Sequence, residues 1–273
     1  MNSSRISKLK QYATFLAKGV SLELYLTPKP GLVDLRDSGS HQDLSLATME
    51  HSIRIVTHYL DRLYLSLTCG ESFTSQTAIG KQTEQTLLDD LGTNTHKGYI
   101  FLSGLLLVAC WQAGSTDEQR LRESIVAVAG QFFTEQGEQE THGKQQRTRH
   151  GGGGIVREAL NGFPALFDEA VPTYRTAIKR HECHKTASFA MMGRLMQIVD
   201  DTTALHRCGA VGLSRIRKDG LQIEQMIARG EDCEPFLHDL NRQYIQMNLT
   251  MGGVADMLGL SYSYLLACGH PLS

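Results

Sequence analysis

The sequence predicts an all-α protein, a single-domain multi-helix bundle over residues 1–273. Three observations indicate this class. Apolar residues recur every three or four positions along most of the chain, and the apolar–polar alternation typical of strands is nearly absent. With 41% hydrophobic and 21% charged residues among 273, the chain can also bury a large core.

Individual helices can be placed from their apolar stripes. Residues 9–24 and 46–67 carry such stripes, and the second predicts a helix of about six turns. The 46–67 stripe is also compatible with a homodimer interface, although a core face is the simpler expectation. The apolar run at residues 99–111 predicts a buried helix. Further helices are expected over residues 121–132, 155–160, 189–199, 237–247 and 252–267.

Two stretches interrupt this pattern. Residues 27–45 contain Pro28, Pro30 and Gly31, which predict a rigid loop because proline fixes its own backbone and restricts the residue before it. Residues 134–154 are strongly polar and end in four glycines. We expect either a mobile lid or a linker between subdomains there.

Charge and composition exclude several classes of protein. A net charge of −2 argues against nucleic-acid binding, which needs a basic excess. No apolar run approaches the roughly 20 residues that span a bilayer, so no membrane segment is expected. No secretory signal is visible, and the six cysteines lie far apart without a Cys-x-x-Cys pair. We therefore expect a cytoplasmic protein with reduced thiols.

The residues just before the 99–111 run predict an anion site. They are Asn94, Thr95, His96, Lys97 and Gly98. A polar cluster at the amino end of a buried helix lies where unpaired amides and the positive end of the dipole attract anions. We expect phosphate to bind to these amides, with Lys97 as a point charge.

The loop at residues 27–45 gathers further polar side chains, namely Lys29, Asp34, His41 and Asp43. His41 and Asp43 can face one site if the segment is extended. Carboxylates suit Mg²⁺, which also takes water and phosphate oxygens as ligands. The alternative is that Asp34 and Asp43 are turn and cap residues.

Two more carboxylates stand beside expected helix ends. Asp201 follows Asp200 at a point where one helix can end and the next begin. Asp256 follows the pair Gly252 and Gly253 near the start of the last helix. Adjacent aspartates also form solvated turns, and an aspartate near a helix start also complements the dipole, so both interpretations stay open.

Together these motifs resemble a known family, the triphosphoribosyl-dephospho-coenzyme A synthases. The resemblance holds in order and spacing from about residue 24 to residue 266. It is carried by the following residues: Thr27-Pro28-Lys29-Pro30-Gly31-Leu32-Val33-Asp34, Gly39-Ser40-His41-Gln42-Asp43, Asn94-Thr95-His96-Lys97-Gly98, Glu158-Ala159 with Gly162-Phe163-Pro164, Asp201-Thr202 with Arg207, and Gly252-Gly253 with Ala255-Asp256.

The resemblance implies a helical enzyme that joins ATP and 3′-dephospho-coenzyme A and releases adenine. The product is the precursor of the prosthetic group of citrate lyase or malonate decarboxylase. Mg²⁺ is implied as the cofactor that accompanies ATP. Two alternatives remain: a Mg²⁺-dependent hydrolase of a nucleotide N-glycosidic bond, and a nucleotide-binding module without catalysis.

The resemblance also suggests roles for residues. A carboxylate can stabilise positive charge on the ribose, and a histidine can carry protons because its ordinary pKa lies near neutrality. The expected catalytic residues are His41, Asp43, His96, Glu158 and Asp201. The expected Mg²⁺ ligands are Asp34, Asp43 and Asp201. The expected substrate-binding residues are Lys29, Asn94, Thr95, Lys97, Gly98, Arg207, Gly252, Gly253 and Asp256.

Overall fold

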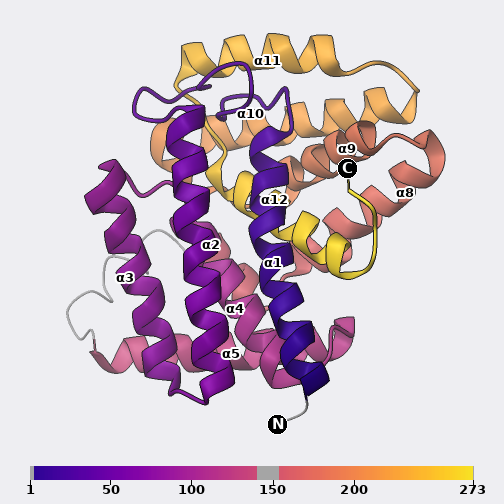
Figure 1. Cartoon of the computed structure of the whole chain (residues 1–273). Helices are drawn as coiled ribbons and strands as arrows, with labels where there is room; N and C mark the ends of the chain where they lie inside the picture. The colour runs from indigo at the N-terminus through magenta and orange to yellow at the C-terminus, as the bar shows by residue number, and fades with distance from the viewer. Residues whose placement is uncertain (1–2, 140–153, 273) are drawn as a thin grey trace.

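The computed structural model describes residues 3–139 and 154–272, which contain helices and no strand (Figure 1). This confirms the predicted all-α class. The helices are α1 (Ser3–Tyr25), α2 (Leu46–Cys69), α3 (Phe73–Leu91), α4 (Lys97–Ala113), α5 (Glu118–Gln139), α7 (Ile155–Leu160), the π-helix η2 (Ala165–Ala170), α8 (Val171–His181), α9 (His184–Ile198), α10 (Thr202–Ala228), α11 (Glu234–Met247) and α12 (Gly252–Ala267).

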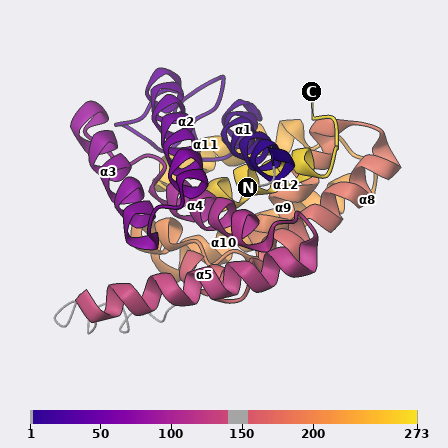
Figure 2. The same cartoon turned by 60° about the horizontal axis from the view of Figure 1, so that its bottom comes forward.

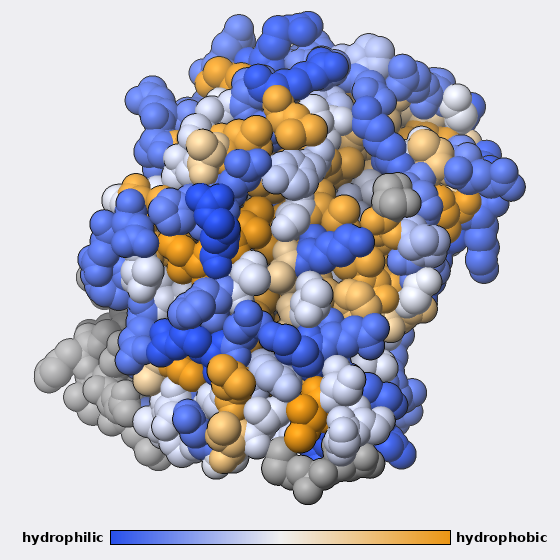
Figure 3. Space-filling model, in the orientation of Figure 1, coloured by the Kyte–Doolittle hydropathy of each residue, from blue (hydrophilic) through white to orange (hydrophobic). Residues whose placement is uncertain are grey.

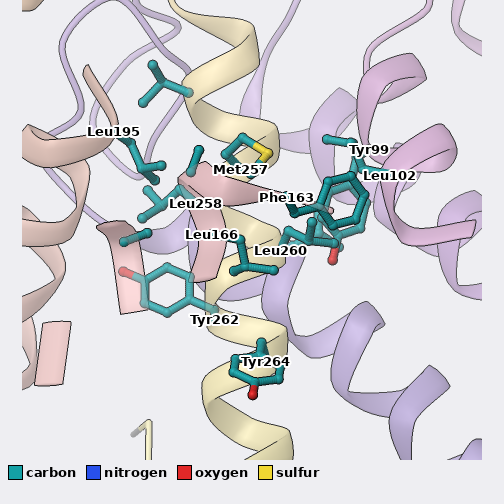
Figure 4. Packing of buried hydrophobic residues seen from close by; sticks show 14 of the residues in the cluster. Tyr99, Leu102, Phe163, Leu166, Leu195, Met257, Leu258, Leu260, Tyr262 and Tyr264 are labelled. Carbon is teal, nitrogen blue, oxygen red and sulfur yellow. The ribbon is translucent and has the colours of Figure 1, made fainter. Parts of the chain in front are cut away.

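Helix α12 forms the centre of the bundle. Its apolar residues are buried all round, as for Leu258, which is fully enclosed. Side chains of α4 and η2, among them Leu102 and Leu166, gather around it in Figure 4. Helix α1 packs along α12 very closely, because a side chain at Gly19 would overlap the backbone of Gly259. This contact fixes the position of the first helix against the last.

The remaining helices surround this pair. Figure 1 shows α11 across one end of the bundle and α5 across the other, and Figure 2 shows α5 from below. The face in Figure 3 carries mainly hydrophilic residues, with apolar residues in separate groups. No single helix in the described chain is long and apolar enough to cross a membrane; α4 and α5 reach that composition only as a pair bent by 117°.

Most predicted helices are confirmed, including α2, α4, α7 and α12. Helix α3 was not predicted because it buries only Ile79, Thr83 and Leu87, too few for a clear stripe. The polar stretch was expected to begin at residue 134, and this is wrong because α5 continues to Gln139. Its glutamates and glutamines favour helix. The rest of the expected lid or linker, residues 140–153, lies outside the described residues.

The predicted loop at residues 27–45 is confirmed as non-helical, and internal hydrogen bonds hold its shape. The Asp34 carboxylate accepts from the amides of Lys29 at 2.9 Å and Arg36 at 2.7 Å. The Gly31 amide donates to Asn241 Oδ1 of α11 at 2.9 Å. The loop is therefore tied to the end of the bundle that α11 covers.

Candidate active site

A cavity of about 320 Å³ lies where the amino ends of α4, α10 and α12 meet, beside the end of α1 and the loop. Each helix start carries about half a positive charge, so their convergence favours an anionic ligand. Many residues predicted from sequence line this cavity: His41, Asn94, Thr95, His96, Lys97, Gly98, Gly252, Gly253 and Asp256.

The segment of residues 94–98, here named the α4 wall, contributes polar groups to the cavity. His96 is the N-cap residue of α4 but makes no side-chain capping bond within the described chain. His96 Nε2 and Asn94 Oδ1 are buried and find no hydrogen-bond partner among residues 3–139 and 154–272. Buried polar atoms are normally paired, so these two atoms point to a ligand.

The other ring nitrogen of His96 contacts α2. Ser52 Oγ lies 2.5 Å from His96 Nδ1, and it also contacts Thr95 Oγ1. Ser52 is fully buried. Sequence reasoning did not find Ser52, because a serine inside the apolar pattern of a helix gives no signal.

The two candidate histidines do not titrate near neutrality, which corrects the sequence-based expectation. Burial, followed by the charge of Lys29, lowers the pKa of His96 from 6.5 to about 4. Burial and the guanidinium of Arg207 likewise lower the pKa of His41 to about 4, against the opposing effect of Asp43. Both rings are therefore neutral at pH 7 in the free protein.

His41 differs from His96 because both of its nitrogens have protein partners. His41 Nε2 lies 3.0 Å from Thr250 Oγ1, and the Arg207 guanidinium lies 3.3 Å from His41 Nδ1. Arg207 also donates to the Ser40 carbonyl at 2.7 Å and to Asn248 Oδ1 at 3.1 Å. Arg207, a residue of α10, thus ties the loop to the end of α11, and it does not line the cavity.

Asp43 lies at the edge of this arrangement. Its side chain is 60% exposed, and its Oδ1 is 3.9 Å from His41 Nδ1. Thr93 Oγ1 donates to the other carboxylate oxygen, Asp43 Oδ2, at 3.3 Å. The predicted proximity of His41 and Asp43 is therefore present, but Asp43 is outside the lining of the cavity.

Lys29 is buried and does not line the cavity. It is 1% exposed and forms an ion pair with Glu23, and it donates to the Glu23 carbonyl at 2.6 Å. Glu23, which sequence reasoning missed, lines the cavity. Burial raises the pKa of Glu23, while the neighbouring Lys29 charge opposes the shift.

Two predicted catalytic carboxylates hold helix ends. Asp201 caps α10 by accepting from the Ala204 amide at 2.9 Å, and it also accepts from the Val254 amide of α12 at 3.0 Å. Glu158 accepts from the Ala165 amide at 3.0 Å and is outside the cavity lining. Asp201 therefore joins the starts of α10 and α12 behind the cavity.

Asp256 is the carboxyl group best placed for chemistry. It lines the cavity against Gly98, where any side chain would overlap the Asp256 carboxylate. Burial raises the pKa of Asp256 well above its usual range, and the charges of Glu23 and Asp201 raise it further, against the Tyr99 amide that lowers it. The environment thus favours a protonated Asp256, which can donate a proton.

Comparison with known proteins identifies the family. The model of the family "ATP:dephospho-CoA triphosphoribosyl transferase" matches residues 9–267. The chain belongs to this family. No solved structure matches it.

Curated relatives cover most of the chain. A 2-(5''-triphosphoribosyl)-3'-dephosphocoenzyme-A synthase from Pectobacterium atrosepticum is 30% identical over an alignment of 262 residues that covers 90% of this chain and 86% of the relative. A protein from Acinetobacter calcoaceticus with the same name, marked probable, is 30% identical and covers 91% and 87%. One from Pseudomonas putida, also marked probable, is 27% identical and covers 93% and 94%.

Among the residues that the structure describes, the carboxylates do not form a protein-built metal centre. In the two described ranges no group of three or more His, Cys, Asp or Glu side chains is arranged to hold a metal ion. Asp34 and Asp201, two of the predicted Mg²⁺ ligands, accept from backbone amides, and Asp43 lies apart at the edge. The predicted ligand set does not fit Mg²⁺, so we derive no step of the reaction through a metal.

Proposed function

We propose that this transferase moves the triphosphoribosyl group of ATP onto 3′-dephospho-coenzyme A and releases adenine. The observation that carries the proposal is the cavity at which three helix starts meet and which Asp256 lines, in an environment that favours its protonated form. Such a cavity offers both partial positive charge for a triphosphate and a proton for a leaving base.

The triphosphate is proposed to bind between the starts of α4 and α12. The amides of Lys97, Gly98 and Gly252 lie in the first turns of these helices, at the cavity. The Lys97 side chain is 66% exposed and pairs with Glu84 at 3.3 Å, so it can turn to a phosphate at little cost. A neutral Asp256 avoids repulsion between its own charge and the triphosphate.

The chemical step breaks the bond between ribose C1 and adenine and forms a bond from C1 to the acceptor 2′-hydroxyl oxygen. In the proposal, Asp256 gives its proton to the departing adenine. The carboxylate so formed stabilises positive charge on the ribose and then accepts the proton of the 2′-hydroxyl. Asp256 returns to its starting state, and no other reactant is needed.

The cavity also has an apolar side, which favours transfer over hydrolysis. It is formed by Val20, Leu32, Val33, Leu44 and Met49. Apolar walls suit a purine base and leave little to hold a competing water. This side of the cavity is the proposed place for adenine.

The remaining partners are part of the same proposal. Mg²⁺ would arrive bound to the phosphates of ATP, and the reaction would take place in the cytoplasm, without nucleic acid or membrane. Its product would serve the prosthetic group of citrate lyase or malonate decarboxylase. The apolar stripe of α2 is largely buried in the core, and a homodimer stays a prediction.

Adenine release tests the function. The protein is incubated with ATP and Mg²⁺, with and without 3′-dephospho-coenzyme A, and adenine and the product mass are measured. The proposal predicts adenine release only with the acceptor, together with a product that contains both. Release without the acceptor would indicate a hydrolase, and no release would indicate a binding module.

A further inference from the structure

We propose that Ser52 of α2 is a positioning residue that holds His96 in the tautomer with a proton on Nε2, so that His96 donates a hydrogen bond to the substrate phosphates. This inference rests on the proposed function for the identity of the acceptor. The tautomer itself can be tested without any reaction.

The first argument is the contact between the two side chains. Ser52 Oγ lies 2.5 Å from His96 Nδ1, and both residues are buried. Ser52 comes from α2, whereas His96 precedes α4. The contact therefore joins the two helices through side chains that are 44 residues apart in sequence. A hydrogen bond to one ring nitrogen decides which nitrogen carries the proton of a neutral imidazole.

The second argument counts protons along the chain Thr95–Ser52–His96. Ser52 Oγ contacts both Thr95 Oγ1 and His96 Nδ1, and it has one proton to give. If Thr95 donates to Ser52 and Ser52 donates to Nδ1, the ring proton is on Nε2. If the direction is reversed, Nδ1 carries the proton and Nε2 presents a lone pair.

The third argument is the surroundings of the ring. His96 lies at the start of α4 beside Lys97, and burial, followed by the charge of Lys29, lowers its pKa to about 4. The ring is thus neutral, and only the tautomer decides whether Nε2 donates or accepts. A lone pair would repel phosphate oxygens at this wall, whereas an N–H adds a donor to the amides of Lys97 and Gly98. The anion-binding surroundings therefore favour the arrangement in which Thr95 donates to Ser52 and Ser52 donates to His96 Nδ1, with the ring proton on Nε2.

The fourth argument is Nε2 itself. It is the ring atom opposite the Ser52 contact, and it is buried without a hydrogen-bond partner in the part of the chain that the structure describes. A donor left unpaired in the free protein costs stability unless a ligand pairs it. The chain from Thr95 through Ser52 also polarises the Nε2 proton and strengthens its bond to an anion.

The direct test is the tautomer of His96 in the whole protein. We would record ¹⁵N spectra of histidine-labelled protein at pH 7 and assign the His96 signals by their loss in His96→Gln. The proposal predicts the Nε2-protonated form in the wild type and a mixture or the Nδ1-protonated form in Ser52→Ala. An Nδ1-protonated ring in the wild type would overturn it, and this result needs no variant of Ser52 to fold.

Kinetics provide a second readout. Ser52→Ala should raise the KM for ATP about tenfold, the loss of one charge-assisted hydrogen bond. Ser52→Thr, which keeps the hydroxyl, should restore both the tautomer and the KM. Ser66→Ala is the matched control, since Ser66 is a buried serine of α2 that donates to Glu71 at 2.7 Å. It should change neither.

These outcomes separate the two proposals. If the wild type has the predicted tautomer but releases no adenine, the proposed function fails and the role of Ser52 stands. If Ser52→Ala keeps both the wild-type tautomer and the wild-type KM, Ser52 is only a packing residue.

Discussion

The α4 wall and the loop at residues 27–45 border the same cavity, and their polar side chains behave differently. In the loop, Asp34 accepts from three backbone amides and both nitrogens of His41 have protein partners. On the α4 wall, Asn94 Oδ1 and His96 Nε2 have none within the described ranges. The polar groups of the loop thus form hydrogen bonds that stabilise the loop itself. Asn94 Oδ1 and His96 Nε2 of the α4 wall are left to bind a ligand.

This difference shows that residue type alone does not identify the side chains that bind a ligand. Both segments contain a histidine and charged side chains, and both carry motifs of the family. The deciding quantity is whether a polar atom already has a partner in the free protein. The predictions below test this distinction, from the largest expected effect to the smallest.

The largest effect is expected for Asp256→Asn, which keeps the shape of the side chain but removes its proton. Turnover at saturating substrate should fall about 10²- to 10⁴-fold, the usual contribution of a general acid. Adenine release provides the rate, and circular dichroism the control for folding. Turnover within threefold of the wild type would remove Asp256 from the chemical step.

The pH dependence of that rate is a separate prediction. Since burial raises the pKa of Asp256 and so favours the protonated form, kcat should fall as the pH rises past that raised pKa. The pH profile of adenine release checks this. A profile that rises with pH would mean that the group acts as a carboxylate base.

Acid should destabilise the protein through its neutral histidines. The pKa of His96 is lowered from 6.5 to about 4, so the unfolded state binds a proton first as pH falls below 6.5. The free energy of unfolding that neutral His96 contributes above pH 6.5 is lost as the pH falls from 6.5 to about 4, and the loss reaches about 3 kcal/mol. The raised pKa of Glu23 acts in the opposite direction. Urea unfolding of the wild type and His96→Gln at pH 7 and pH 5 isolates the histidine effect, and equal losses in both would contradict it.

The fold could be predicted further than the site. The apolar stripes of α2 and α12 are local patterns, and they sufficed to place both helices. The α4 wall was also predicted, because five polar or small residues directly precede an apolar run.

What the loop residues do could not be predicted, since their partners are distant in sequence. Arg207 reaches the Ser40 carbonyl across 167 residues, and Asn241 reaches Gly31 across 210. A single sequence carries no sign of either contact. For the same reason Asp201 suggested a catalytic carboxylate, whereas the structure places it behind the cavity as a joint between α10 and α12.

A smaller difference is expected between the unfolding free energies of the His41→Gln and His96→Gln variants. His41→Gln breaks contacts to Thr250 and Arg207 and should cost about 1–2 kcal/mol of unfolding free energy. His96→Gln should cost less, because it also removes a buried nitrogen that the free protein leaves unpaired. Chemical denaturation at pH 7 measures both, and a larger loss for His96→Gln would break the comparison.

The smallest effect is expected at a helix start away from the cavity. Ser45 caps α2 by accepting from the Thr48 amide at 3.2 Å. Ser45→Ala should cost about 1 kcal/mol of stability and leave the KM for ATP unchanged. A changed KM would show that Ser45 itself also contacts substrate.

The most direct test of the distinction is the ATP affinity of two matched variants, measured by calorimetry without acceptor. The polar groups of the α4 wall are expected to receive the triphosphate, whereas those of the loop are expected to hold the loop in shape. His96→Gln should therefore weaken ATP binding about tenfold, while His41→Gln, assayed where it is fully folded, should bind within about twofold of the wild type. Weakened binding in His41→Gln with normal binding in His96→Gln would contradict the account.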